Sequence, residues 1–322
     1  MKIIKKIAQL SAVLLGAVCM SPAIGQTTNA PIRMVVIVAP GGSADAMARM
    51  VGEKLGTSLK TSVVVENKPG AGGNLATQFV AKATPDGTTL LVTANNHTIN
   101  PTLFADAGYK LNDLEPIADL MWGPSVIVVP ANSPYQSFDQ LMADAKKRPS
   151  AIAYGSAGIG TPSHIAGELL NQAAGIKLTH APYRGSGPSL TDLAGGQIPV
   201  VLSSLVAAMP LIKSGKIRPL AVTSQKRWRG AENIPAVSEF GLPTYEHLTF
   251  IALMAPKGLT DAQIKFLSDH VMTALKDEAV QARVASLGGE VGHMNAAAFK
   301  NYINKDYEIS ANIVKLTGMK AE

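Results

Sequence analysis

The sequence predicts an α/β protein with two lobes, each built on a mostly parallel sheet, and a cleft between them. Short apolar runs rich in β-branched residues alternate with segments of helical spacing, which is typical of parallel sheets covered on both faces. The alternation begins near residue 32 and begins again near residue 127. A chain of 322 residues has the length of two domains, and its 47% of hydrophobic residues can supply a core for each.

Residues 1–25 have the pattern of a secretory signal peptide. Three lysines precede an uncharged apolar run, and the small residues Ala23 and Gly25 follow it, which predicts cleavage after Gly25. The alternative is a single membrane anchor, but the apolar run is short for a span. Cleavage removes three lysines and the single cysteine, Cys19, so the formal net charge falls from +6 to +3. The mature chain then has no thiol for a disulfide or a thiolate metal site.

In the first half of the mature chain, apolar strands alternate with helices. Strands are expected at 32–40, 62–67 and 88–95, and helices at 41–56 and 68–83. The first strand ends at Pro40, and glycines mark the turn before the second helix.

In the second half, the same pattern is longer. Strands are expected at 127–131, 151–156, 178–183, 201–206, 219–224 and 248–258, with helices at 138–149, 261–276 and 295–316 and further helices between the strands.

The turns that follow strands are the first place to look for a site, because ligands of open parallel sheets bind outside the carboxyl ends of the strands. Two such turns, at 39–45 and 154–161, are rich in glycine and serine and lead into helices. The first N–H groups of a helix are unpaired and carry the positive end of its dipole, so an anion can bind there. Pro162 suits the first helical turn. The alternative is an ordinary tight turn, but two of them in separate α/β units favour an anion site.

Motifs for other chemistries are absent from the sequence. Neither Ser156 nor Ser186 lies in a G-x-S-x-G nucleophile elbow, and there is no dinucleotide fingerprint or P-loop. The histidines lack metal-ligand spacing and are interpreted as surface or buried residues, except His97 and His164, which fall in candidate loops. Scattered basic residues do not indicate nucleic-acid binding. The sequence therefore predicts no catalytic residue, cofactor or metal.

Several motifs resemble the Bug-type solute-binding receptors of tripartite tricarboxylate transport systems. The most specific are "ENKPGAGGN" (66–74) and "GTPSHIAGEL" (160–169), and the resemblance covers nearly the whole mature chain. It implies a periplasmic venus-flytrap protein of type II that is not an enzyme. Such a receptor delivers a small carboxylate to a membrane permease, and we expect it to act as a monomer.

The resemblance also implies where the ligand binds. The loops Pro40 to Asp45 and Ser156 to His164 would hold one carboxylate from opposite sides, through backbone N–H groups and the hydroxyls of Ser156 and Thr161. Arg184 stands where the family often has lysine, and its fork could hold a second carboxylate; the alternative is a surface arginine. The implied ligand-binding residues are Gly41, Gly42, Ser43, Asp45, Asn95, Asn96, His97, Ser156, Ala157, Gly158, Thr161, His164, Arg184, Ser203 and Ser204.

Departures from the family pattern bear on the ligand. Val38 replaces a common aromatic residue, and Ser203 and Ser204 stand where the family often has an acid. The ammonium of an amino acid would then lack a partner, which is costly for a buried charge. The stretch 95–97, Asn-Asn-His, can donate to oxygen. Together these features favour a di- or tricarboxylate or an aromatic carboxylate over an amino acid.

The predicted domains are residues 26–125 with 248–322, and residues 126–247. The two crossings between them, near Ser125 and Leu248, would form the hinge. Two other functions stay open from the sequence: an exported hydrolase of small esters, and a ligand-sensing co-receptor for a membrane signalling protein.

Overall fold

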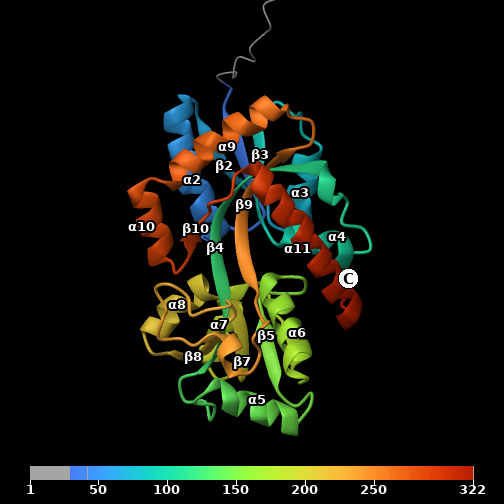
Figure 1. Ribbon diagram of the computed structural model, residues 1–322, viewed down its shortest axis with the longest axis vertical. Coiled ribbons are helices and arrows are strands. Elements are labelled where there is room, and N and C mark those ends of the chain that lie inside the picture. Colours follow the sequence, from blue (N-terminus) through green and yellow to red (C-terminus); the bar gives the residue numbers. More distant parts are fainter. Residues whose placement is uncertain (1–29, 42, 322) are drawn as a thin grey trace, which may run out of the picture. The chain divides into compact units, whose positions relative to one another are not determined.

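A computed structural model describes residues 30–41 and 43–321 (Figure 1). The segment predicted as a signal peptide lies outside the described residues. By their contacts, residues 31–322 form one compact unit, which contains all the helices and strands that the structure describes.

The first lobe is built on a sheet whose outer strands are parallel. Strand β1 pairs in parallel with β2 on one side and β3 on the other, and β9 pairs antiparallel with β3. The elements of this part are β1 (Ile32–Val36), α2 (Ser43–Leu59), β2 (Val63–Asn67), η1 (Ala71–Gly73), α3 (Asn74–Ala81), β3 (Thr89–Ala94), α4 (Asn96–Leu103), η2 (Leu111–Asp113) and β9 (Leu248–Pro256).

The second lobe repeats this arrangement with different strands. Strand β5 pairs in parallel with both β6 and β7. The elements are α5 (Phe138–Lys147), β5 (Ala153–Ser156), α6 (Pro162–Ala174), β6 (Thr179–Pro182), α7 (Ser186–Ala194), β7 (Val200–Ser204), α8 (Leu205–Lys213), β8 (Ile217–Val222) and η3 (Val237–Phe240).

A single long strand, β4 (Leu114–Pro130), belongs to both sheets (Figure 1). Its part from Leu114 to Pro124 pairs with β9, and its part from Ser125 onward pairs with β7 and β8. The path of paired strands is therefore continuous, in the order β2-β1-β3-β9-β4-β7-β5-β6. The α/β class is confirmed, although the antiparallel pairing of β4 and β9 at the centre was not predicted.

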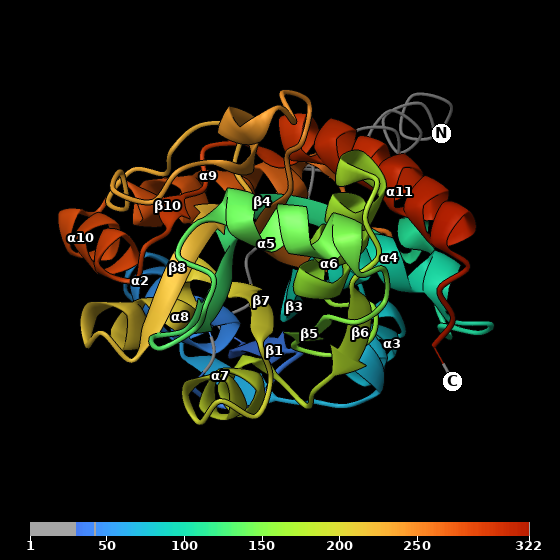
Figure 2. The ribbon, with the colours of Figure 1, turned by 90° about the horizontal axis from the view of Figure 1, so that it is seen from below.

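Three helices follow β9, where the sequence predicted two. They are α9 (Asp261–Leu275), α10 (Glu278–Ser286) and α11 (Ala296–Thr317), and the short strand β10 (Glu290–Val291) pairs with β4. Asp277 starts α10, because its side chain accepts the N–H groups of Ala279 and Val280. Helix α11 belongs to the first lobe by its packing on β4 and α4, yet it also contacts α6 of the second (Figure 2).

Apolar side chains fill the space between sheets and helices. In the first lobe, Met34 and Val36 of β1 pack against Met47 and Val51 of α2, and all four side chains are fully buried. The second lobe has its own cluster around Tyr154, with Phe138, Leu141, Ile127 and Leu202. These clusters follow from the two periods in the sequence, alternate residues on strands and every third or fourth on helices.

Candidate functional site

The loop between β5 and α6 is held by its own hydrogen bonds. The N–H of Gly158 donates to Ser156 Oγ (3.0 Å), and that of Ala157 donates to Ser163 Oγ (3.0 Å). The Thr161 hydroxyl donates to the Gly158 carbonyl oxygen (2.7 Å). In this conformation, these three predicted ligand donors are engaged within the loop, and Ser156 Oγ serves there as an acceptor.

Two backbone N–H groups at the start of α6 have no acceptor among the described residues. They belong to Ser163 and His164. Pro162, before them, has no N–H to satisfy. The free N–H groups and the positive end of the helix dipole coincide here. An anion site at the start of this helix was predicted from the sequence. In this conformation, its backbone donors would be Ser163 and His164 rather than Ala157 and Gly158.

The loop between β1 and α2 is closed by Asp45. Its carboxylate accepts the Gly41 N–H (3.0 Å), the Arg49 guanidinium (2.9 and 3.1 Å) and the Asn67 amide (2.9 Å). Burial alone would raise the pKa of Asp45, but the hydrogen bonds from Arg49, Gly41 and Asn67 outweigh it, so the pKa lies below its ordinary value. Asp45 is thus ionised, and the guanidinium of Arg49 compensates its negative charge. The Gly41 N–H is engaged by Asp45 and is not free. Of the predicted neighbours, Ser43 begins α2 and Gly42 lies outside the described residues.

The predicted ligand residues after β3, Asn95, Asn96 and His97, mostly make contacts within the protein. Asn95 is 1% exposed, and its amide oxygen accepts the Phe250 N–H (3.0 Å). Asn96 donates to the Gly72 carbonyl oxygen (3.0 Å). His97 is fully buried and stacks on Tyr109 at 5.7 Å, and burial lowers its pKa to about 4. The structure therefore places Asn95 and His97 in the interior, which argues against direct contact with a ligand in this conformation.

Arg184 lies in the loop after β6, beside the loop after β5. Gly185 donates to the Ala157 carbonyl oxygen (2.9 Å), which ties the two loops together. Gly158 has a φ of 132°, and a Cβ there would lie 2.9 Å from the Tyr183 carbonyl oxygen, so the close approach requires glycine. The Arg184 side chain is exposed and makes no ion pair or hydrogen bond with any described residue. It is thus an unpaired cation in the loop beside the one that leads into α6, and it is available to a ligand.

Ser203 and Ser204 end β7. Ser203 is fully buried opposite Val126, and its hydroxyl has no partner within the described part of the chain. Ser204 caps α8, where its Oγ accepts the Ala207 N–H (3.4 Å). Neither residue brings a negative charge to the end of this strand.

His180 of β6 is a residue of this site that sequence reasoning missed. Its Nε2 lies 2.7 Å from Ser156 Oγ, and its ring stacks on that of His164, with centroids 3.7 Å apart and an interplanar angle of 11°. Burial lowers the pKa of His180 to about 4; burial and the neighbouring His180 lower that of His164 to about 3. Ser156 and His180 are 24 residues apart, and no sequence motif links them. They come together only because β5 and β6 pair in parallel.

The two lobes meet beside these loops. A Cβ on Gly160 would lie 2.1 Å from Leu103 Cδ2, so the loop of the second lobe lies directly against α4 of the first. Next to it, Ile165 packs with Ile99 of α4 and with Ile313 of α11. The α6 start is therefore at the junction between lobes.

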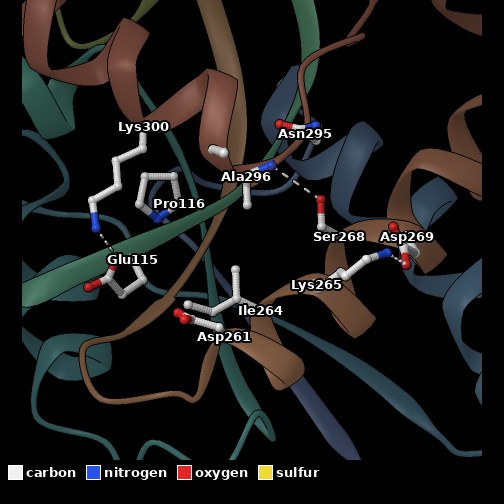
Figure 3. Close-up of a pocket in the computed structure, with 11 residues that line it drawn as sticks. Glu115, Pro116, Asp261, Ile264, Lys265, Ser268, Asp269, Asn295, Ala296 and Lys300 are labelled. Atoms are coloured by element: carbon white, nitrogen blue, oxygen red, sulfur yellow. Dashed lines mark hydrogen bonds and ion pairs between the residues drawn. The ribbon is translucent and has the colours of Figure 1, made fainter.

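A separate pocket of about 480 Å³ lies between α9, the start of α11 and β4 (Figure 3). Its charged side chains are largely paired, with Lys300 bonded to Glu115 (2.9 Å) and Lys265 to Asp269 (2.6 Å). It contains none of the residues predicted from the sequence, and four of its five charged side chains, all but that of Asp261, form ion pairs with one another. We therefore place the candidate site at the lobe junction rather than in this pocket.

Among the described residues, no helix combines the length and apolar character needed to cross a membrane. Nor does this part of the chain gather three or more His, Cys, Asp or Glu side chains in a metal-binding arrangement.

Comparison with known proteins identifies the class of this two-lobed α/β fold. The sequence model described as "Tripartite tricarboxylate transporter family receptor" matches residues 47–319. Protein BugT of Bordetella pertussis is 33% identical over 293 residues, with 90% of each chain covered. A UPF0065 protein of Bordetella bronchiseptica is 37% identical over 262 residues, covering 81% of this chain and 77% of the relative.

Solved structures agree. The periplasmic binding protein BugD has a TM-score of 0.80 at 32% identity, covering 91% of this chain and 99% of its own. R. palustris Rpa4515, solved with adipate, has a TM-score of 0.83 at 29% identity, covering 90% of this chain and 98% of its own. MatC from Rhodopseudomonas palustris, with bound malate, has a TM-score of 0.80 at 26% identity, covering 88% and 98%. The chain belongs to the tripartite tricarboxylate transporter receptor family, whose members are periplasmic solute-binding proteins.

Proposed function

We propose that this protein captures a small carboxylate, with a dicarboxylate as the preferred class, between its lobes and delivers it to a membrane permease. It is exported, its signal peptide is cleaved near Gly25, and it works as a monomer without a cofactor or catalysis. Family membership and the relatives solved with adipate and malate support this proposal.

One observation carries the ligand class. The unpaired N–H groups of Ser163 and His164 lie in the first turn of α6 at the lobe junction, and Arg184, which has no partner among the described residues, lies in the loop that is hydrogen-bonded to the one before this helix. The two backbone N–H groups can bind one carboxylate, and the Arg184 guanidinium can bind a second one through two hydrogen bonds. The remaining predicted ligand residues would act by shaping these loops or through bridging waters.

An amino acid fits this arrangement less well. Ser203 and Ser204 bring no negative charge, and the Asp45 carboxylate is engaged by Arg49 and Asn67. An ammonium would therefore have no anionic partner at these positions, and a buried unpaired charge is costly.

Ligand capture would close the lobes about a hinge at the two crossings, which divide residues 26–125 and 248–322 from residues 126–247. At the crossings, the Thr223 hydroxyl accepts the Ser125 N–H (2.8 Å) and lies 2.7 Å from the His247 carbonyl oxygen. This side chain would hold the two hinge segments side by side during closure. A ligand that reaches both lobes only when they are closed favours that state.

Calorimetric titration of the mature protein with adipate, malate and their monomethyl esters tests the proposal. We expect a diacid to bind and its monoester to bind more weakly. No binding of any of a broad set of small di- and tricarboxylates, with no thermal shift, would contradict the proposed function.

The variant Arg184→Gln should erase most of the preference for a diacid over its monoester. It keeps side-chain length but removes the charge and the fork. A hydrogen bond to a charged group contributes about 1.5–3 kcal/mol, which is roughly ten- to a hundredfold in Kd. Arg229→Gln, at another exposed arginine, is the matched control and should bind as the wild type does. Equal affinity of the wild type for diacid and monoester would refute the role given to Arg184.

One observation favours the hydrolase alternative. Ser156 and His180 have the separation of a nucleophile and its base (2.7 Å). However, Ser156 is fully buried, and its Oγ already accepts the Gly158 N–H. Incubation with small carboxylate esters should give no turnover above that of a Ser156→Ala variant.

A further inference from the structure

The hydroxyl of Ser156, which is fully buried, sits at the centre of a small network with the half-buried His180 and Gly158. Its Oγ lies 2.7 Å from His180 Nε2, 3.0 Å from the Gly158 nitrogen and 3.2 Å from the Gly158 carbonyl oxygen. The Gly158 N–H can only donate, so Oγ accepts that bond. The single hydroxyl hydrogen is then left for either His180 Nε2 or the Gly158 carbonyl oxygen.

The proton positions of the second imidazole follow from a similar argument. His164 Nδ1 accepts the Gly160 N–H (3.1 Å), so a neutral His164 carries its hydrogen on Nε2. That nitrogen lies 4.0 Å from Glu168, whose carboxylate accepts the Tyr154 hydroxyl (2.7 Å). Each of the two stacked rings thus contacts one point of the loop, His180 at Ser156 and His164 at Gly160.

We propose that His180 is a positioning residue: its Nε2 accepts the Ser156 hydroxyl hydrogen, which keeps Ser156 Oγ an acceptor for Gly158 and fixes the loop before α6. The proposal rests on the proposed function for its binding readout. Of the two possible acceptors, His180 Nε2 is 0.5 Å nearer to Oγ than the Gly158 carbonyl oxygen, which already receives the Thr161 hydroxyl. The burial that keeps both rings neutral is consistent with this tautomer.

This arrangement has a consequence for what a ligand meets. Because the Ser156 hydroxyl hydrogen points inward, Ser156 offers no donor to a carboxylate. The loop instead holds the first turn of α6 in place, so that the N–H groups of Ser163 and His164 stay available. His180 therefore acts on ligand affinity through the loop, without touching the ligand.

Nitrogen-15 NMR of histidine-labelled wild-type protein tests the inference without any ligand. We expect His180 to be protonated on Nδ1 and His164 on Nε2 at neutral pH. Protonation of His180 on Nε2 would overturn the proposal, whether or not a carboxylate binds. The proposed function can fail separately, if the tautomers are as expected and no carboxylate binds.

Binding variants test the positioning role. His180→Phe keeps a ring against His164 but removes the acceptor, and we expect about a tenfold rise in the Kd for the diacid. His180→Gln can supply an amide oxygen to Ser156 and should restore most of the affinity. Ser156→Ala should weaken binding as His180→Phe does, and the double variant should be no weaker than either, because the two residues act as one unit. Additive losses in the double variant, or a wild-type Kd for a folded His180→Phe, would overturn the proposal.

Discussion

Lowering the pH from 7 to 4.5 should destabilise the folded protein strongly, because histidines that are buried and neutral in the folded chain take up protons when it unfolds. Burial lowers the pKa of four histidines, to about 4 for His97, His180 and His247 and about 3 for His164. In the unfolded chain, a histidine has a pKa of about 6.5. Between these values the unfolded state binds more protons, so the free energy of unfolding falls as the pH falls.

The magnitude is large because four groups act in the same direction. One pKa unit corresponds to about 1.4 kcal/mol, so the buried His97 and His164 would each contribute roughly 2–3 kcal/mol at pH 4.5, and the half-buried His180 and His247 less because solvent screens them. Asp306 opposes them: burial raises its pKa to about 6, so its proton uptake favours the folded state as the pH falls from 6 toward 4. Asp306 alone does not cancel the four histidines, and the net effect remains a loss of about several kcal/mol, a large part of the stability of a typical domain.

Urea unfolding at pH 7 and pH 4.5 measures this difference. His97→Phe is the diagnostic variant, because His97 is fully buried, stacks on Tyr109 and has no hydrogen-bond partner for either ring nitrogen among the described residues. It should lose less stability than the wild type on acidification. His293→Gln, at an exposed side chain, is the surface control. Equal stability of the wild type at the two pH values would contradict the prediction.

The sequence predicted the parallel strands of each sheet well because their pattern is local. The strands around Met34 and Tyr154 are short apolar runs next to amphipathic helices, and the structure has them as β1 and β5. It predicted only the end of β4. Pro116, Gly123 and Pro124 interrupt that pattern, and the register shifts along β4 show how the sheet accommodates irregular positions.

The site was predicted only in outline for a related reason. Glycines and the helix start at Pro162 are visible in a sequence, so the loop itself was found. Which N–H groups stay free depends on where nearby side chains point, and this is not visible in a sequence. The Ser163 hydroxyl accepts the Ala157 N–H, and the Asp45 carboxylate accepts that of Gly41. Whether the predicted residues contact a ligand stays a prediction, tested by the titrations above.

Gly292→Ala should destabilise the protein by about 3 kcal/mol or more, a large effect for adding one methyl group. A Cβ at this position would lie 2.0 Å from the Asp119 carbonyl oxygen and 2.8 Å from its Cγ. The Gly292 N–H donates to the Leu120 carbonyl oxygen (2.9 Å), so the backbone cannot move away without breaking that bond. The Asp119 carboxylate also accepts the N–H groups of His293 (3.1 Å) and Met294 (2.8 Å), which would be lost with it.

These bonds fix the segment that leads into α11, the helix that packs on β4 and reaches α6 beside the candidate site. We therefore expect Gly292→Ala to weaken diacid binding as well as to lower the denaturant midpoint. Gly187→Ala is the matched control, because a Cβ there would have no heavy atom within 4 Å, and it lies within α7, where alanine is the better helix former. Urea unfolding of both variants at pH 7 measures the effect. An unchanged midpoint for Gly292→Ala would show that the segment before α11 can shift freely and would refute the anchoring role of Asp119.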